Sequence, residues 1–161
     1  MSLEANPSPP PANSPIAAVG IVCFDEQGRV LLIRRGNPPR AGDWSIPGGR
    51  LEWGETLVSA ALRELYEETA IEADILGLID AVDGIFSSRT TGIVHRHYVL
   101  IDYVATYRSG TARAGDDATE ARFVALAALA DYALWDKTVD IIHRGHAIWQ
   151  SAQTAFINPQ I

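Results

Sequence analysis

The chain is poor in cysteine, since Cys23 is the only one among 161 residues. A single cysteine cannot form an internal disulfide, so no disulfide framework holds this fold, and we expect a reducing, cytoplasmic location. Cys23 lies in the apolar run IAAVGIVCF. This context predicts a small, buried core residue rather than a reactive thiol.

Long hydrophobic runs are also missing. No apolar stretch approaches the roughly 20 residues that a helix needs to cross a bilayer. The start of the chain lacks the basic and apolar regions of a signal peptide. Hydrophobic residues make up 47% of the chain and charged residues 20%, which are typical of a globular protein. We therefore expect no membrane partner.

Basic residues are few relative to acidic ones. The chain has 13 Lys and Arg against 20 Asp and Glu, for a formal net charge of −7. This balance argues against a broad basic surface that would hold a nucleic acid polymer. If the protein binds a phosphate compound, another source must supply positive charge.

Proline is concentrated at the start of the chain, where residues 1–15 hold five of the nine prolines and almost nothing apolar. Such a segment buries too little surface to offset its ordering entropy, so we predict a disordered tail and one domain over residues 16–161. Apolar patterns predict strands and helices of an α/β protein, with a mixed sheet and helices packed on it. The predicted strands are a hairpin over 16–35 that turns at 25–28, a short piece at 44–49, then 71–86, 95–106 and 121–126; the predicted helices are 56–69 and the region from 126 to 152.

Three glutamates crowd into one turn of the helix predicted at 56–69: Glu64, Glu67 and Glu68. At 100° per residue, Glu64 and Glu68 lie beside the apolar stripe, whereas a solvated charged face would lie opposite it. Like charges four residues apart destabilise a helix by about 0.2 to 0.5 kcal/mol, and Arg63 offsets only part of this through Glu67. Because Mg²⁺ prefers carboxylate oxygens, the cluster predicts a divalent-cation site rather than a helix with glutamates for solubility.

Two glycines, Gly48 and Gly49, precede this helix. Without side chains, they let the backbone approach an ion or a phosphate closely. An ordinary turn is the alternative explanation for one glycine pair. Since Glu52 and Glu55 follow the pair, we interpret the segment as one wall of a pocket.

The spacing of these residues resembles the Nudix box, which is written G, five residues, E, seven residues, R-E-U-x-E-E-x-G-U, where U is a bulky aliphatic residue. The motif is long and fixed in spacing, so a chance match is improbable. Ala70 departs from it, because the family has glycine there to end the helix in a left-handed conformation. The matching residues are Gly49, Glu55, Arg63, Glu64, Leu65, Glu67, Glu68 and Ile71.

The resemblance implies a Nudix-type α/β/α sandwich with a metal-binding loop and helix. It implies hydrolysis of a pyrophosphate bond in a nucleoside diphosphate derivative with Mg²⁺ or Mn²⁺. The implied metal ligands are Glu64, Glu67, Glu68 and the carbonyl of Gly48, and the implied bracing residues are Arg63 and Glu55. The family often adds an acid from a later loop, for which Glu120 is the candidate here, and either Glu64 or Glu120 could be the base.

The segment RRGNPPRAGDWSIPGGRLEWGE is similar to the branch of the family that cleaves ADP-ribose and related nucleotide sugars. Enzymes that trim nucleoside triphosphates are the first alternative, and a nucleotide sensor without activity is the second. A homodimer is the expected assembly. The chain offers Arg35, Arg40 and Arg50 for phosphates and Trp44 for a base, with surface charge and ordinary packing as the competing explanations.

Other aromatic residues and two histidines are weaker candidates for binding a base or a metal ion. Stacking on a base is one interpretation of Trp53, Trp135 and Tyr98, and ordinary packing is the commoner one. His95 and His97 alternate on a predicted strand and could share a metal ion. A histidine pair without a third ligand is more often structural or substrate-facing.

Overall fold

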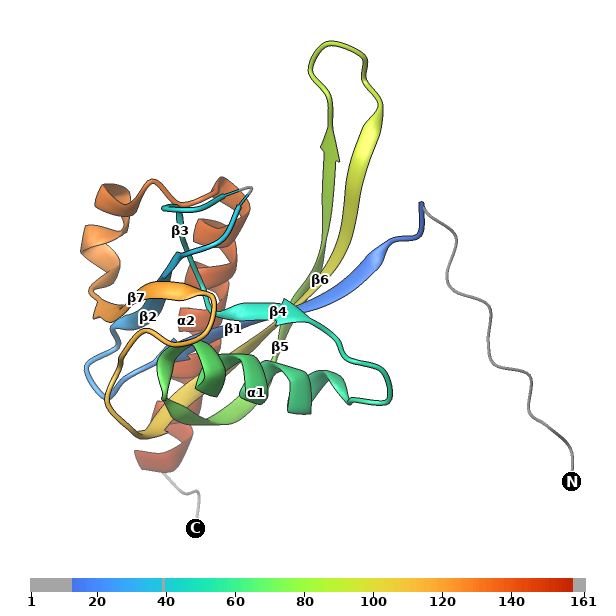
Figure 1. Cartoon of the computed structure of the whole chain (residues 1–161). Helices are drawn as coiled ribbons and strands as arrows, with labels where there is room; N and C mark the ends of the chain where they lie inside the picture. The colour runs from blue at the N-terminus through green and yellow to red at the C-terminus, as the bar shows by residue number, and fades with distance from the viewer. Residues whose placement is uncertain (1–12, 39, 158–161) are drawn as a thin grey trace, which may run out of the picture.

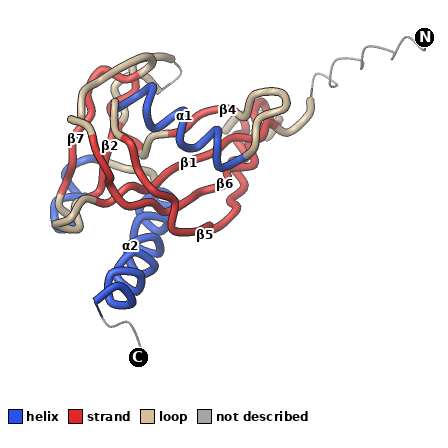
Figure 2. Tube along the Cα trace, turned by 90° about the horizontal axis from the view of Figure 1, so that it is seen from below, coloured by secondary structure: helices blue, strands red, loops and turns tan. Residues whose placement is uncertain are grey.

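The computed structural model describes residues 13–38 and 40–157, so most of the tail predicted at residues 1–15 lies outside the described residues. The elements form a mixed sheet between two helices (Figures 1 and 2). None of the helices in the described part of the chain is long and apolar enough to span a bilayer. The strands are β1 (Ile16–Phe24), β2 (Val30–Arg35), β3 (Trp44–Ser45), β4 (Gly48–Arg50), β5 (Glu72–Ser87), β6 (Val94–Ser109) and β7 (Ala118–Val124).

The seven strands form one sheet with the order β3-β2-β1-β6-β5, while β4 pairs with β1 and β7 pairs with β2. β1 and β6 are parallel, with Gly20 opposite Asp102, and the other pairs are antiparallel. β5 and β6 form a long hairpin whose tip projects from the body of the protein (Figure 1). This arrangement confirms the predicted mixed sheet.

Helix α1 (Leu57–Thr69) packs on one face of the sheet and α2 (Asp136–Ile157) on the other (Figure 2). Alternate residues of β1 belong to the two cores: Ile21 and Cys23 pack with α1, and Val22 and Phe24 pack with α2. A strand covered on both faces reads as a continuous apolar run, which is why IAAVGIVCF lacks polar alternation. Burial raises the pKa of the Cys23 thiol to about 12, so Cys23 is the inert core residue that its context predicts.

The predicted hairpin between β1 and β2 is confirmed, with Phe24 paired to Val30. The Asp25 carboxylate closes the turn by accepting hydrogen bonds from the backbone N–H groups of Gln27 at 3.0 Å and Arg29 at 2.9 Å. Asp side chains commonly hold turns in this way. The predicted helical region after residue 126 begins with a 3₁₀ helix, η1 (Leu126–Tyr132), which ends at the left-handed Ala133 before α2 starts.

Helix α1 begins and ends as the sequence predicts. Thr56 is its N-cap and accepts a hydrogen bond from the Ser59 N–H at 3.2 Å. At the other end Ala70 has φ 57° and ψ 23°, and its N–H donates to the Tyr66 carbonyl at 2.8 Å. The chain therefore keeps the left-handed cap with alanine in place of glycine.

Ala70→Gly is expected to stabilise the protein by about 1 kcal/mol, because a left-handed backbone disfavours a residue with a Cβ and costs glycine little. Thermal unfolding should show a melting temperature higher by about 2–4 °C. Ala147→Gly, on the exposed side of α2, is the matched control. It should destabilise the protein by about 0.5–1 kcal/mol, and the same sign of effect at both positions would contradict the explanation.

Candidate active site

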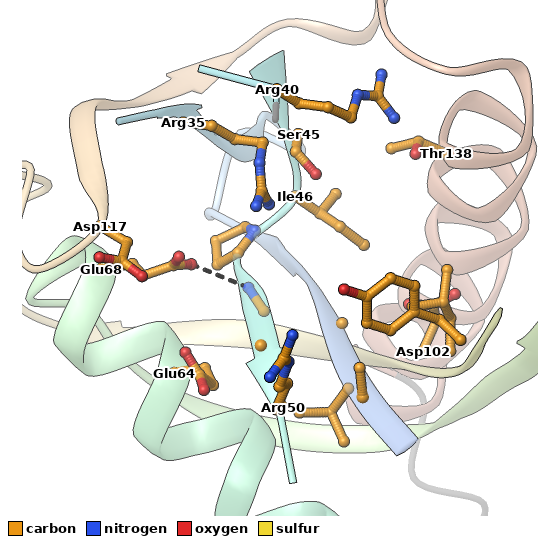
Figure 3. A pocket seen from close by; sticks show the side chains of 18 of the residues that line it. Arg35, Arg40, Ser45, Ile46, Arg50, Glu64, Glu68, Asp102, Asp117 and Thr138 are labelled. Carbon is orange, nitrogen blue, oxygen red and sulfur yellow. Dashed lines mark hydrogen bonds between the residues drawn. The ribbon is translucent and has the colours of Figure 1, made fainter. Parts of the chain in front are cut away.

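A cavity of about 900 Å³ opens between α1, β4, the inner strands and the start of α2 (Figure 3). One side of it is acidic and is lined by Glu64, Glu67 and Glu68 from α1. The loop between β6 and β7 adds Asp116 and Asp117 to the same side. The cavity has the size of a small-molecule site and collects most of the residues that the sequence singles out.

The three helix glutamates differ in burial in the order that their angular positions predict. Glu68 is 4% exposed, and the side chains of Glu64 and Glu67 are 13% and 43% exposed. Glu64 and Glu68 thus lie beside the buried seam of α1, and Glu67 points outward. Two of the three acids are not on a solvated helix face, so solubility does not account for them.

Glu68 reaches across to the glycine pair. Its Oε2 accepts a hydrogen bond from the Gly48 N–H at 2.9 Å (Figure 3). Burial is the main cause that raises the pKa of the Glu68 carboxyl to about 7, the charge of Glu64 adds to the rise, and the Gly48 N–H opposes it. Gly48 therefore contacts the Glu68 carboxylate through its backbone N–H group.

Gly49 leaves room for the Glu64 carboxylate. A Cβ at Gly49 would lie 2.3 Å from Glu64 Oε1 and 2.5 Å from Oε2, closer than real atoms approach. Burial raises the pKa of Glu64, and the neighbouring Arg63 guanidinium opposes the rise. A side chain at this position would therefore displace the Glu64 carboxylate.

Arg63 ties the loop before α1 to the helix. Its guanidinium donates to both Glu55 oxygens at 2.8 and 2.9 Å, to Glu64 at 2.9 Å and to Glu67 at 3.0 Å. It also donates to the Arg50 carbonyl at 3.2 Å. These contacts join the same loop and helix that the resemblance assigns Arg63 and Glu55 to brace. The hydrogen bonds from Arg63 lower the pKa of Glu55.

The later loop contributes different acids from the one predicted. Glu120 lies on β7 opposite Arg34 of β2, with its carboxylate bound to Arg34 at 3.1 Å and also to Arg122. It does not line the cavity. The structure therefore brings Asp116 and Asp117, not Glu120, beside the helix glutamates.

Backbone contacts explain this placement. The N–H groups of Arg113 and Gly115 donate to the carbonyls of Thr69 and Glu68 at 3.0 and 3.1 Å. They satisfy carbonyls at the end of α1 that have no partner within the helix. The loop is thus docked on the helix end, and the next two residues are the cavity-lining aspartates. The pair of adjacent aspartates in GDDATE was the only sequence signal for them.

All four residues predicted to contact substrate line the cavity: Arg35, Arg40, Arg50 and Trp44. Arg40 is bound to Asp43 at 2.8 Å, and Trp44 packs edge-on against Tyr132. The Arg35 Nε is buried and has no hydrogen-bond partner among the described residues. Arg35 points into the cavity (Figure 3). A guanidinium that lines a cavity is suited to an anionic ligand.

The side of the cavity beside α2 is aromatic. Phe86 lies 6.4 Å from Tyr98 and 6.2 Å from Trp135 between ring centroids, and all three line the cavity. Trp53, by contrast, is 95% exposed and does not line it. His95 lines the cavity without His97, so the structure does not bring this pair together there.

The donor set suits a hard divalent cation. Five carboxylates share one side of the cavity, and oxygen ligands of this kind are what Mg²⁺ and Mn²⁺ prefer. As the side chains stand, no three His, Cys, Asp or Glu residues in the described part of the chain form a ready-made metal cluster. Glu64 and Glu67 are instead held by Arg63, so an arriving cation would compete with that guanidinium.

A mixed sheet between two helices, with an acidic helix and its glycine loop opening on an arginine-lined cavity, defines an α/β/α protein of the Nudix fold. Comparison with known proteins agrees, because the model of the NUDIX domain matches residues 14–144. The chain belongs to the NUDIX family.

Individual relatives support this assignment. The chain is 35% identical over 108 residues to the ADP-ribose pyrophosphatase of Methanocaldococcus jannaschii, covering 67% of this chain and 60% of that protein. It thus spans less than two thirds of that relative. The crystal structure of the MutT NUDIX hydrolase from Burkholderia pseudomallei has 28% identity and a TM-score of 0.67 over 81% of this chain and 98% of that one. The NUDIX domain of Shewanella oneidensis NrtR, solved with ADP ribose, shares the fold at 23% identity and a TM-score of 0.72, over 89% of this chain and 94% of that one.

Proposed function

We propose that the protein hydrolyses a pyrophosphate bond in a nucleoside diphosphate derivative, with ADP-ribose or a related nucleotide sugar as the substrate. One observation carries the proposal: a single cavity joins a carboxylate cluster, the Arg35 guanidinium and an aromatic wall. These three parts suit a cation, a diphosphate and a base in that order. The name of the M. jannaschii relative supports the choice of ADP-ribose.

A divalent cation, Mg²⁺ or Mn²⁺, held by Glu64, Glu67, Glu68 and the Gly48 carbonyl, would neutralise phosphate charge and lower the pKa of the attacking water. The residues of the chain supply the rest. Arg35 binds a phosphate oxygen and holds the diphosphate against the glycine loop. Arg63 and Glu55 keep the loop and helix in register, so that the carboxylates stay aimed into the cavity.

In the reaction, the oxygen of water attacks phosphorus and the bridging P–O bond breaks. A nucleoside monophosphate and a sugar phosphate leave. A carboxylate accepts the proton of the water, and this base is either Glu64 or one of the two cavity-lining aspartates. Asp116 and Asp117 replace Glu120 as the loop candidates, because Glu120 is engaged with Arg34 and Arg122 outside the cavity.

Asp116→Asn and Asp117→Asn are each expected to lower kcat. The loss should be about 100-fold in the variant that replaces the catalytic base. Glu120→Gln is the matched variant and should leave kcat within about threefold of the wild type, because its surface ion pairs contribute little. Initial rates with saturating substrate measure both. A loss of activity in Glu120→Gln with none in either aspartate variant would reverse this assignment.

A substrate panel with product identification tests the function. ADP-ribose, other nucleotide sugars and nucleoside triphosphates are incubated with the protein in Mg²⁺ and, separately, in Mn²⁺. The expected products of ADP-ribose are AMP and ribose 5-phosphate. Release of pyrophosphate from a triphosphate with no action on ADP-ribose would overturn the proposed substrate, and tight binding without any hydrolysis would favour a sensor.

A further inference from the structure

The cavity contains one buried carboxylate that the proposed hydrolysis does not use. Asp102, on β6, is 6% exposed and lines the cavity. Figure 3 places it on the far side of the cavity from Glu64 and Glu68, below the start of α2. No hydrogen-bond donor from the described residues reaches its carboxylate, and burial with the charge of Asp80 raises its pKa to about 6.

The surrounding structure makes room for this acid but does not pair it. A Cβ at Gly20, which faces Asp102 across the parallel ladder, would lie 2.2 Å from Asp102 Oδ1. Arg144 reaches the sheet from α2, yet its guanidinium binds Asp80 at 2.6 Å. Asp102 is 6% exposed and lines the cavity, so a hydrogen-bond donor on a ligand can reach its carboxylate.

The cavity residues beside Asp102 indicate what kind of ligand group would fit there. The same Gly20 Cβ position lies 2.9 Å from Ile46 Cδ1, so an apolar side chain adjoins the carboxylate. Leu100 and Tyr98 precede Asp102 on the same face of β6, and the Phe86 and Trp135 rings continue the wall. An apolar and aromatic wall with a single acceptor fits a flat base better than a sugar, whose several hydroxyls need several polar partners.

We propose that Asp102 determines base specificity, by accepting a hydrogen bond from the exocyclic amino group of the substrate's nucleobase. The inference rests on the proposed hydrolase function and narrows its substrate class to amino-bearing bases such as adenine. Hypoxanthine presents a carbonyl at that position, which places two acceptors face to face. A site that is built to bind a donor rejects the analogue that lacks it.

The test compares ADP-ribose with its hypoxanthine counterpart, inosine diphosphate ribose. The wild type should prefer ADP-ribose in kcat/KM by about 10- to 100-fold, the range of one hydrogen bond to a charged group. Asp102→Asn should bring the two substrates within about threefold of each other, because an amide can both donate and accept. The loss with ADP-ribose should appear chiefly as a higher KM, because the proposed base contact lies apart from the carboxylate cluster.

Asp131→Asn, which removes one exposed acid outside the cavity, is the control and should keep the wild-type preference. An unchanged preference in Asp102→Asn, or no preference in the wild type, overturns the proposal. An equal loss on both substrates also overturns it, because Asp102 would then contact the ribose that both share. Circular dichroism checks the fold, and Asp102→Ser replaces Asp102→Asn if that variant is unfolded.

A failure of the hydrolase proposal can be distinguished from a failure of the proposed role of Asp102. If the wild type does not cleave ADP-ribose but cleaves triphosphates, ATP and ITP carry the same comparison. If it cleaves neither, equilibrium binding of AMP and IMP by calorimetry decides. A preference for AMP that Asp102→Asn abolishes supports the role of Asp102 even then, and equal binding of AMP and IMP by the wild type overturns it.

Discussion

Glu68→Gln is expected to lower kcat at least about 100-fold while the protein stays folded, a loss typical of one catalytic group. Glutamine keeps the shape of the side chain and an oxygen that can accept the Gly48 N–H, so the contact between α1 and β4 persists. It removes the negative charge that would hold a cation. Burying a neutral amide also costs less than burying a carboxylate, which favours the folded state.

Steady-state rates with saturating ADP-ribose and Mg²⁺ measure this loss, and thermal unfolding checks the fold. Glu26→Gln is the matched control, because Glu26 is an exposed acid in the turn between β1 and β2. It should leave kcat and melting temperature unchanged. Near-normal turnover by a folded Glu68→Gln protein would show that catalysis does not need the Glu68 carboxylate.

The second large effect is expected from Gly49→Ala. The added methyl group would overlap the Glu64 carboxylate, with its Cβ 2.3 Å from Oε1, so Glu64 must turn away. Displacing a catalytic group by about 1 Å can cost about 100-fold in rate. The side chain of Glu64 is able to move, whereas backbone is not, so the effect on kcat should exceed the effect on stability.

Gly77→Ala provides the comparison for this variant. Gly77 lies in β5, nothing lies within 4 Å of its Cβ position, and its φ is not positive. Alanine is therefore tolerated there, and kcat should match the wild type. If Gly49→Ala and Gly77→Ala proteins were equally active, Glu64 would not need its present position for hydrolysis.

Much of the acidic side of the cavity could be predicted from local spacing. Glu64, Glu67 and Glu68 belong to one helix, and the helical repeat alone places two of them beside the buried seam. The same holds for the turn closed by Asp25 and for the cap at Thr56, since each is formed within a few residues. When a motif lies within one loop and one helix, the local backbone conformation determines the relative positions of its residues.

The prediction of Glu120 as the loop acid shows the limit of what local sequence spacing can predict. GDDATEAR offers three acids within five residues, and nothing local says which of them faces α1. The pairing of β7 with β2 directs Glu120 to Arg34, and the docking of residues 113–115 on the end of α1 directs Asp116 and Asp117 into the cavity. Both are long-range contacts.

The sequence by itself therefore determined the hairpin, the acidic helix and the glycine loop, because each is formed within a single helix, strand or turn. Only the tertiary structure decided that Asp102 faces Gly20, that Arg35 points into the same cavity, and which acids of the later loop line it. The physical reason is that strand order and register bring together residues about 80 positions apart, and such pairings depend on the packing of the whole sheet.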